Sequence, residues 1–562
     1  MEPWYWLNEN SRAFLARGYL AEGQTAEDRI KVIADTAEKY LKRDGFSDKF
    51  YEYMSKGWIS LASPVWSNFG SNKGLPISCF GSYVADNMGG IMHTNAEVGM
   101  MSKYGGGCSG YFGAVRGRGA EISGGNGYSS GSVHFMQLFE TLINVVSQGS
   151  VRRGHFAPYL PAEHSDVMEF LDIGTEGNPI QKLTHGVTVG DDWMESMIAG
   201  DEAKRKIWAR IIQRRGEMGY PYIMFNDTAN KNTVDVYKDK DLKIYASNMC
   251  SEIMLPSKED WSFVCCLSSV NLLHYDAWKD TDLVETMVAF LDAVMEDFIV
   301  KLEALRDSDE SEKQLAFKFM ERAYNFAVQN RALGLGVLGY HSLLQAKGLA
   351  FESDEAAEIN KEVFSNIHAK AEAETKRLAV ELGEPEVLKG YGRRNTTLMA
   401  IAPTTSSAFI LGQVSQGIEP IWSNCYVKDV SKMKVTIKNP TLIKLLKEKD
   451  KDSKLVWDSI RDNDGSVQHL DFLSEEEKAV FRTFAEVNQT KIIEQAADRQ
   501  KFIDQGQSLN IMVDPSVSAK DINQLYIHAW KLGIKSLYYQ HSMNAAQQMV
   551  RRKLAEKEAS SK

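Results

Sequence analysis

The first 60 residues carry apolar side chains at helical spacing. Ile30, Ile33, Ala37 and Leu41 fall on one face of a helix. Residues 25–28 read Thr-Ala-Glu-Asp, which is typical of a helix start. The pattern predicts a helical N-terminal region over residues 1–60.

From residue 156 onward, short apolar runs alternate with longer segments of helical periodicity. Strands are predicted at 220–225, 253–255 and 263–265, and helices at 283–305, 312–331 and 354–382. Repeated alternation of strand and helix is typical of α/β architecture with parallel strands. We therefore expect residues 61–545 to form an α/β core.

The C-terminal third is more polar. Within residues 394–407, an apolar strand runs into Pro403 and four hydroxyl residues. Residues 430–475 are expected to be loop-rich, a capping box at 474–477 opens a helix to about residue 503, and a last helix starts at Ser518. A short charged tail over 546–562 is expected to fray.

Glycine and arginine recur together between residues 81 and 155, notably at 117–119 and 149–154. Bare backbone N–H groups and guanidinium forks both favour anions, so these loops fit phosphates, with flexible surface turns as the alternative. Residues 334–339 spell the GxGxxG of dinucleotide-binding folds. Because residues 325–331 before them look helical rather than extended, we interpret these glycines as positions of tight helix packing.

Composition narrows the class of protein. The 562 residues carry a net charge of -10 and 43% hydrophobic residues, which argues for a globular protein without a nucleic-acid surface. No signal peptide and no membrane-spanning run is recognisable, so a cytoplasmic protein is expected. Six cysteines without a C-x-x-C pair, and no H-E-x-x-H, indicate buried or redox-active thiols and no metal site.

The strongest candidate site is the segment 247–252. In an extended chain or a loop tip, residues i, i+2 and i+4 point to one side, so Asn248, Cys250 and Glu252 could face one small ligand. The alternative is that Cys250 is a buried small hydrophobe with incidental polar neighbours.

Separated motifs between Ser60 and Gln540, in a fixed order, resemble the large catalytic (α) subunit of class I ribonucleotide reductases. Asn248-x-Cys250-x-Glu252 is similar to the family's finger-loop motif. The resemblance implies that Cys250 becomes a thiyl radical that takes the 3′-hydrogen of the ribose, that Glu252 is the base on the 3′-hydroxyl, and that Asn248 binds the substrate hydroxyls. It also implies a ten-stranded α/β barrel, built from two five-stranded parallel halves set antiparallel, with a central finger loop and flanking helices.

The same resemblance assigns the redox partners. Reduction at C2′ needs a dithiol, which matches Cys79 and, in the register Cys-x-Leu, Cys265 rather than Cys266. Tyr538 and Tyr539 match a tyrosine pair that relays a proton-coupled electron from a radical-generating β subunit carrying the metallocofactor. The remaining cysteines are expected to be packed thiols: Cys108, Cys266 and Cys425.

Nucleotide sites follow from further matches. A loop for the substrate diphosphate is implied at 403–407, where Thr405 replaces a common acidic residue. The implied substrate-binding residues are Ser63, Ser78, Thr404, Thr405, Ser406 and Ser407. A specificity effector, a deoxyribonucleoside triphosphate or ATP with Mg²⁺, is implied at Asp86, Arg116, Gln148 and Arg152.

Two departures from the family pattern change the expected regulation and partners. Only about 60 residues precede the core, so the N-terminal ATP cone is expected to be absent. No cysteine follows Cys425, so thioredoxin, glutaredoxin or a small-molecule thiol is expected to reach Cys79 and Cys265 directly. The resemblance further implies an α homodimer.

Two other functions remain as alternatives. One is an adenosylcobalamin-dependent class II reductase, which makes its thiyl radical with a bound cofactor and needs no tyrosine relay. The other is a nucleotide-binding homologue that has lost catalysis. Ribonucleoside diphosphates are the expected substrates, with triphosphates as the alternative.

Overall fold

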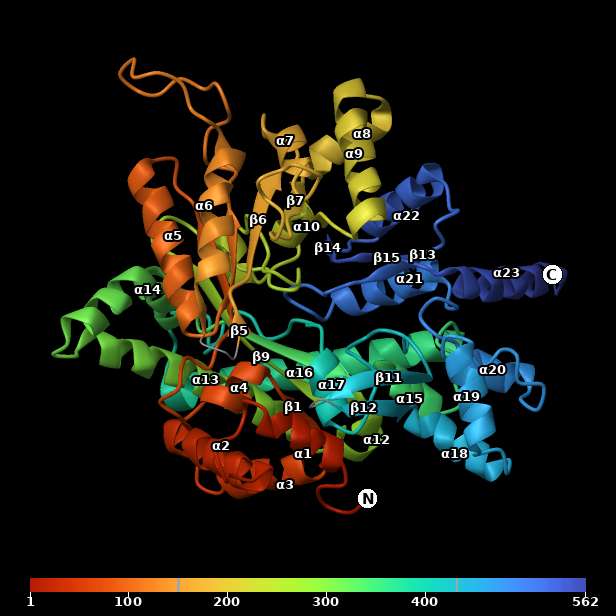
Figure 1. Cartoon of the computed structure of the whole chain (residues 1–562). Helices are drawn as coiled ribbons and strands as arrows, with labels where there is room; N and C mark the ends of the chain where they lie inside the picture. The colour runs from red at the N-terminus through yellow and green to blue at the C-terminus, as the bar shows by residue number, and fades with distance from the viewer. Residues whose placement is uncertain (149–151, 431–432, 562) are drawn as a thin grey trace.

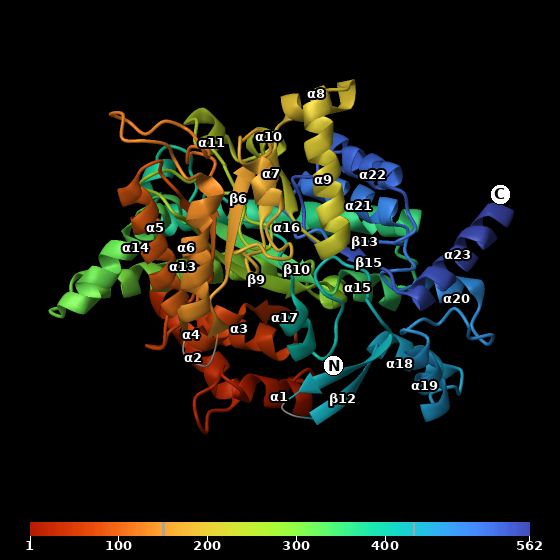
Figure 2. The same ribbon diagram turned by 45° about the horizontal axis from the view of Figure 1, so that its top comes forward.

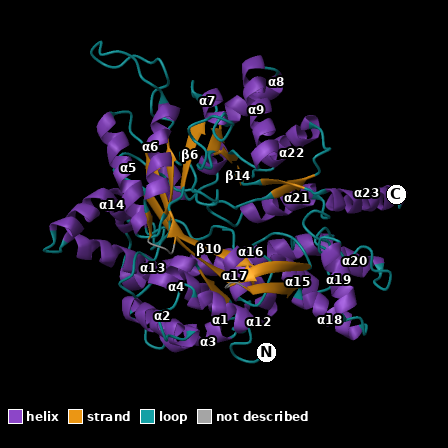
Figure 3. Cartoon of the chain, in the orientation of Figure 1, coloured by secondary structure: helices purple, strands orange, loops and turns teal. Residues whose placement is uncertain are grey.

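The computed structural model describes residues 1–148, 152–430 and 433–561. Strands gather in the interior and helices cover the outside (Figure 1, Figure 3). The strands are β1 Ile59–Leu61, β2 Cys79–Tyr83, β3 Gly107–Tyr111, β4 Ser147–Gln148, β5 Arg152–Arg153, β6 Phe156–Pro161, β7 Gly186–Val189, β8 Tyr222–Phe225, β9 Phe263–Asn271, β10 Leu333–Leu338, β11 Cys425–Val430, β12 Met433–Lys438, β13 Ile511–Val513, β14 Ser536–Leu537 and β15 Gln540–Ser542.

The helices divide into two groups along the chain. Those before β9 are α1 Glu9–Ala16, α2 Ala26–Leu41, α3 Phe46–Ser55, α4 Ser63–Asn68, α5 Met88–Lys103, α6 Ser132–Val145, α7 Val167–Leu171, α8 Asp191–Ala199, α9 Glu202–Met218, α10 Asn226–Lys231 and α11 Asp235–Asp239. Those after it are α12 Tyr275–Trp278, α13 Leu283–Arg306, α14 Ser311–Asn330, α15 Tyr340–Ala346, α16 Asp354–Leu382, α17 Thr405–Ile410, α18 Pro440–Glu448, α19 Lys454–Asp462, α20 Glu475–Val480, α21 Gln489–Gln500, α22 Ala519–Lys531 and α23 Ala545–Ser560.

The N-terminal region is helical, as its periodicity predicts. A capping box starts α2, because the Thr25 hydroxyl accepts from Asp28 N and the Asp28 carboxylate accepts from Thr25 N. The buried Arg29 guanidinium donates to the carbonyls of Trp66 and Phe69, each at 2.7 Å. This side chain therefore fastens α2 to the turn that leads into the core.

One half of the core is a row of five parallel strands in the order β2, β3, β6, β7, β8. Parallel neighbours need crossover connections, and helices α5 to α9 supply them along one side of the sheet (Figure 1). The repeated strand–helix alternation in the sequence corresponds to these units.

The other half runs in the opposite direction and closes the ring. β9 pairs antiparallel with β2, and β10 pairs parallel with β9. Next in the ring, the extended segment at Met399 forms a parallel bridge with Leu335 of β10. The segment at Gln507 forms a parallel bridge with Ile401. Tyr538 N then donates to Leu509 O at 2.9 Å, and β14 pairs antiparallel with β8. These pairings make a ten-stranded barrel of two five-stranded parallel halves set antiparallel, which confirms the predicted fold class.

The segment between α11 and β9 passes through the inside of this barrel, as a finger loop. Its backbone carbonyls accept hydrogen bonds from hydroxyl groups of β3, β6 and β14. These bonds are Ser109 Oγ to Ser247 O (2.8 Å), Tyr159 OH to Asn248 O (2.7 Å) and Ser536 Oγ to Ser251 O (2.7 Å). Buried backbone groups need such partners, so strands of both halves hold the loop.

Gly334 and Gly336 lie in the buried strand β10 and Gly339 follows it as the N-cap of α15, so our interpretation of these glycines as helix-packing positions is wrong. A Cβ on Gly334 would lie 2.9 Å from Cys265 Sγ, and one on Gly336 would lie 2.8 Å from Ala400 O. The glycines therefore allow close approach of neighbouring strands. The dinucleotide motif remains excluded, because the first two glycines fall inside the strand rather than in a turn that follows it.

The three long helices predicted between residues 283 and 382 are confirmed as α13, α14 and α16, and the strand at 220–225 is confirmed as β8. Ser518 caps α22 as predicted. The run 253–255 is buried, but it belongs to the finger loop rather than to a strand. These residues are apolar because they are buried inside the barrel, and their composition therefore resembles that of a buried strand.

The C-terminal third is more regular than its polarity predicts. Residues 430–475, expected to be loops, contribute to the hairpin β11–β12 and contain α18 and α19. The helix predicted over 474–503 is interrupted between α20 and α21. The tail, expected to fray, forms α23, which starts with a capping box of Asn544 and Gln547. Figure 2 shows the hairpin beside α1 and α23 reaching away from the body.

None of the helices in the described ranges combines the length and apolarity needed to cross a lipid bilayer.

The close contact at Gly336 leads to a prediction about stability. Gly336→Ala should lower the free energy of unfolding by about 1–3 kcal/mol, because its Cβ meets the Ala400 carbonyl. Gly216→Ala is the control: Gly216 lies within α9 with open space around its Cβ position, and alanine there should be neutral or stabilising by about 0.5–1 kcal/mol. Urea unfolding of both variants measures the difference, and equal midpoints would contradict the packing argument.

Candidate active site

The finger loop forms a turn at its tip, which is the second of the two conformations that the sequence allows. Asn248 Oδ1 accepts hydrogen bonds from Glu252 N (3.1 Å) and Ile253 N (3.3 Å), and Ser251 adopts a left-handed backbone conformation with φ of 64°. The side chain of Asn248 therefore shapes the loop. Its Nδ2 lies 3.8 Å from Cys79 Sγ, so the same amide also faces a cysteine of β2.

The Glu252 carboxyl group is buried inside the barrel. Its Oε2 lies 3.0 Å from Ser508 Oγ, and the same hydroxyl is hydrogen-bonded to Cys250 O. A hydroxyl carries one hydrogen, so the Glu252 carboxylate shares the Ser508 donor with the Cys250 carbonyl. Burial raises the pKa of Glu252 to about 7, with partial offset by hydrogen bonds from Asn248 and Ser508. A carboxyl group with such a pKa exchanges a proton readily at neutral pH.

Two cysteines face each other where the barrel halves meet. The antiparallel register of β2 and β9 places Cys79 directly opposite Cys265. Opposed Cα atoms in such a pair are about 4.5–5.5 Å apart, which is within the span of a disulfide. Both are thiols in this structure. Side chains alternate along a strand, so Cys266 points away, and its Sγ donates to Leu291 O in α13 at 3.3 Å.

The rings of Tyr538 and Tyr539 are in tilted contact beside the finger loop. Their ring centroids are 4.5 Å apart with the planes at 54°, and the Tyr538 hydroxyl is hydrogen-bonded to Cys250. Tyr222, at the start of β8, contacts both rings at 4.9 and 5.2 Å and is hydrogen-bonded to Tyr539. Burial raises the pKa of Tyr538 far above its usual value, so this phenol stays protonated.

A cavity of about 230 Å³ joins these tyrosines to the hydroxyl-rich loop. Pro403, Thr404 and Thr405 line one side, and Tyr538 and Tyr539 line the other. The Thr404 hydroxyl accepts from Gly417 N at 2.7 Å, so it is already engaged within the loop. The structure does not bring Ser406 and Ser407, which lie in α17, into the lining of this cavity.

The remaining predicted substrate residues are Ser78, which adjoins β2, and Ser63, at the start of α4. Ser78 immediately precedes Cys79, and its carbonyl accepts from Gly107 N at 2.7 Å. Ser63 begins α4, and its Oγ accepts from Tyr19 OH at 3.3 Å. Neither serine is among the residues that line the 230 Å³ cavity.

Two of the predicted effector residues form an ion pair. Arg116 Nε lies 3.0 Å from Asp86 Oδ2, and Arg116 N donates to Asp86 Oδ1 at 3.1 Å. Gln148 and Arg152 are backbone partners in the hairpin β4–β5, but their side chains and residues 149–151 lie outside the described structure.

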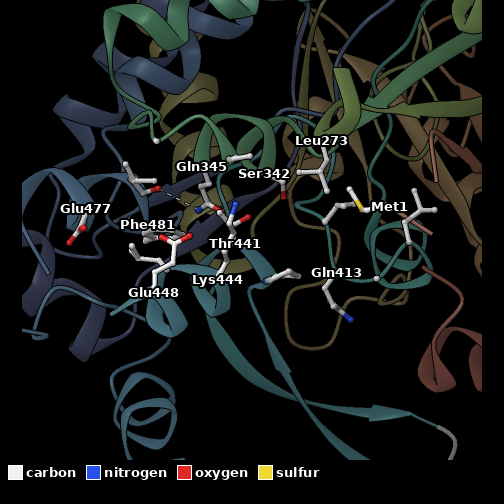
Figure 4. A pocket seen from close by; sticks show the side chains of 18 of the residues that line it. Met1, Leu273, Ser342, Gln345, Gln413, Thr441, Lys444, Glu448, Glu477 and Phe481 are labelled. Carbon is white, nitrogen blue, oxygen red and sulfur yellow. Dashed lines mark hydrogen bonds between the residues drawn. The ribbon is translucent and has the colours of Figure 1, made fainter. Parts of the chain in front are cut away.

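A second cavity, of about 700 Å³, lies between α15, α18, α20 and the N-terminus (Figure 4). Its lining includes Gln345, Lys444 and Glu448. The residues that the sequence predicts for catalysis or nucleotide binding do not line it. It is therefore separate from the site inside the barrel.

Sequence reasoning missed several polar residues that touch the site. Residues 504–510 read Asp-Gln-Gly-Gln-Ser-Leu-Asn, and this polar run is almost entirely buried. Ser508 bonds the loop, Asn510 donates to Glu419 at 2.5 Å, and Gln505 reaches Cys265. The signal that could have found them is this density of amides and hydroxyls after a predicted helix.

The raised pKa of Glu252 predicts a pH-dependent stability. Because the folded protein holds this proton more tightly than the unfolded chain, the contribution is complete below pH 4.5 and is lost as pH rises through about 7. Between pH 5 and 8, wild-type protein should lose up to about 3 kcal/mol relative to Glu252→Gln, from the size of the shift. Urea unfolding at both pH values measures this, with Glu476→Gln, at an exposed position, as the control. Parallel pH curves for Glu252→Gln and wild type would contradict it.

Known proteins share this architecture. The family model for the ribonucleotide reductase barrel domain matches residues 77–204, 202–387 and 385–540, and that for the all-alpha domain matches 5–74. The chain is 54% identical to the solved Actinobacillus ureae class Id ribonucleotide reductase alpha subunit, with a TM-score of 0.90 over 98% of this chain and 99% of that one.

Curated relatives agree with the solved structure. The ribonucleoside-diphosphate reductase large subunit of Invertebrate iridescent virus 3 is 32% identical over 603 residues, covering 93% of this chain and 92% of the relative. That of Caenorhabditis elegans is 30% identical over 569 residues, covering 87% and 70%. The chain therefore belongs to the ribonucleotide reductase large-subunit family and is a catalytic subunit of that enzyme.

Proposed function

We propose that this chain reduces ribonucleoside diphosphates to deoxyribonucleotides by a thiyl-radical mechanism centred on Cys250. The observation that carries the proposal is the meeting of three redox elements within one barrel. These are the finger-loop thiol, the opposed pair Cys79 and Cys265, and Tyr538 hydrogen-bonded to Cys250. The viral and nematode relatives are ribonucleoside-diphosphate reductases by name, which supports a diphosphate substrate.

The proposed steps use the groups in order. The Cys250 thiyl radical takes the 3′-hydrogen of the ribose, while Glu252 accepts the 3′-hydroxyl proton and Asn248 binds the hydroxyls. The 2′-hydroxyl then leaves as water. Cys79 and Cys265 together supply two electrons and two protons and become a disulfide. Finally, Glu252 returns its proton to the 3′-oxygen, Cys250 returns its hydrogen atom to C3′, and the radical returns along the relay.

The radical is proposed to arrive through Tyr539 and then Tyr538 from a β subunit, which holds the radical metallocofactor. Contact of Tyr538 with both Tyr539 and Cys250 supports this order. The same contact disfavours a cobalamin-dependent reaction, which needs no relay. Turnover with adenosylcobalamin and no second protein would favour that alternative.

We also propose binding sites for the substrate and for the effector, and partners for this chain. The loop at 403–407 is proposed to bind the substrate phosphates, with Ser63 and Ser78 at the ribose. Asp86, Arg116, Gln148 and Arg152 are proposed to bind a nucleoside triphosphate effector with Mg²⁺ at the face of an α homodimer. We place the enzyme in the cytoplasm, with thioredoxin, glutaredoxin or a small thiol as reductant.

Substitution of the radical cysteine tests the proposed function. With ribonucleoside diphosphate, a β subunit from the same genome and dithiothreitol, Cys250→Ser should form no deoxyribonucleotide above background, because serine cannot carry the radical. Cys425→Ser is the matched control, since Cys425 packs in a separate apolar cluster and should keep wild-type turnover within about twofold. Residual turnover of the Cys250 variant would disprove the mechanism.

The relay makes a separate prediction. Tyr538→Phe keeps the ring but loses the hydroxyl next to Cys250, so it should reduce turnover by at least about a thousandfold while leaving nucleotide binding unchanged. Tyr391→Phe, which removes a surface hydroxyl bonded to Asp239, should be near wild type. Isothermal titration with nucleotide and product assays measure the two properties separately.

A further inference from the structure

Gln505 lies at the turn where α21 leads into the second half of the barrel, and its backbone is tightly held. Gln505 N donates to Met399 O at 3.2 Å, and Lys535 Nζ donates to Gln505 O at 3.0 Å. The preceding Asp504 accepts from Leu398 N and Met399 N, at 2.8 and 2.9 Å. With its side chain fully buried, Gln505 occupies one fixed position beside β9.

The Gln505 amide joins the finger loop to one sulfur of the dithiol. Its Oε1 accepts from Met254 N at 2.9 Å, which fixes the orientation of the amide and turns Nε2 the other way. Nε2 lies 3.4 Å from Cys265 Sγ, 2.9 Å from Leu333 O and 3.0 Å from Thr397 Oγ1. Two amide hydrogens are thus shared among three acceptors. The share taken by sulfur grows when the sulfur becomes negative, because charge-assisted hydrogen bonds are stronger.

The two opposed thiols differ in access. Cys265 is 1% exposed, whereas Cys79 is partly exposed. Burial raises the pKa of Cys265 well above its ordinary value, and the Gln505 hydrogen bond is a group that acts against that rise. A buried thiolate without a donor is costly. Cys266, the next residue, donates to a backbone carbonyl of α13 and lies on the other face of β9.

We propose that Gln505 is a positioning residue for thiol–disulfide exchange, which stabilises Cys265 as the leaving thiolate when an external thiol attacks Cys79. The proposal rests on the proposed function, since that function creates the disulfide. It assigns the two cysteines different tasks. Cys79 receives the reductant, and Cys265 receives the electron pair.

The exchange balances with one dithiol. A thiolate of the reductant attacks Cys79 Sγ and forms a mixed disulfide. The Cys79–Cys265 bond breaks, and its electron pair goes to Cys265 Sγ, where the Gln505 N–H donates. The second thiol of the reductant gives its proton to Cys265 and, as thiolate, attacks the sulfur of the reductant in the mixed disulfide. Cys79 leaves as a thiolate and takes up the proton that the first thiol of the reductant had released. One dithiol becomes a disulfide and the protein recovers two thiols.

The test uses the full-length chain without substrate or β subunit. The protein is oxidised, the Cys79–Cys265 disulfide is verified by peptide mapping, and its reduction by dithiothreitol is followed by quenched alkylation. Gln505→Met, which cannot donate, should slow reduction about ten- to hundredfold, the size of one hydrogen bond to a charged group. Gln507→Met is the matched control, because Gln507 is buried on the same segment and its amide donates to Ala496 O and Gln500 Oε1 instead.

A second measurement separates positioning from simple damage to the fold. The equilibrium constant with dithiothreitol at pH 7 should stay within about twofold in Gln505→Met, because the reduced protein holds both sulfurs as thiols and the lost bond acts on the thiolate. Misplaced sulfurs would change rate and equilibrium together. Gln505→Glu preserves the acceptor for Met254 N, and its reduction should fall further behind wild type as pH rises and the carboxylate ionises.

Three results would overturn the proposal: a wild-type rate for Gln505→Met, equal slowing in Gln507→Met, or a parallel pH profile for Gln505→Glu. None of them bears on radical chemistry, because the exchange assay contains no substrate. Loss of turnover in Cys250→Ser together with a wild-type exchange rate in Gln505→Met would leave the proposed function intact and reject the role of Gln505. Normal turnover in Cys250→Ser would reject the proposed function instead.

Discussion

The structure depends on satisfying the backbone of an irregular segment inside a barrel. A loop in such a place has no ladder of its own, and each unpaired peptide group in a dry interior costs free energy. Hydroxyl groups of β3, β6 and β14 donate to three carbonyls of the finger loop, and the Gln505 side chain accepts from one of its N–H groups. Because these partners come from both halves of the barrel, the position of Cys250 is fixed by closure of the whole ring.

Burial away from water also determines the protonation states of the ionisable groups in the site. Burial raises the pKa values of Glu252 and Cys265, and hydrogen bonds offset only part of that effect. The resting site therefore holds few net charges, and charge develops only when a proton or an electron pair moves. Donors that are already in place, such as Ser508 and Gln505, need little rearrangement at that moment.

The sequence predicts the barrel through its strand–helix alternation and its ordered motifs, and these agree with the observed pairings and the family comparisons. It fails where tertiary context outweighs local pattern. Gly334 looks like part of a ligand motif or a helix contact, yet the close approach of Leu267 and Cys265 on the neighbouring strand β9 leaves no room there for a side chain. Residues 253–255 look like a strand because the barrel interior demands apolar side chains.

Only part of the site can be predicted from the sequence, again because tertiary context is missing from it. Residue types that carry unusual chemistry, such as Cys250 and the adjacent Tyr538 and Tyr539, stand out in a sequence. Ser508 and Gln505 do not, because serine and glutamine are common and their roles arise only from what closure of the barrel brings next to them. Side-chain register along β9 likewise separates Cys265 from Cys266, which are adjacent in the sequence.

The two halves of the barrel meet at two antiparallel strand pairs, and the proposed electron-transfer residues lie at these pairs. The join of β2 with β9 carries the opposed thiols, and the join of β8 with β14 leads directly into Tyr538, with Tyr222 on the facing strand. The proposed one-electron relay and the proposed two-electron thiol pair thus lie at the two different seams of one ring. Both seams contact the finger loop, Cys79 through Asn248 and Tyr538 through Cys250. In the proposed mechanism the radical and the disulfide therefore meet at this loop.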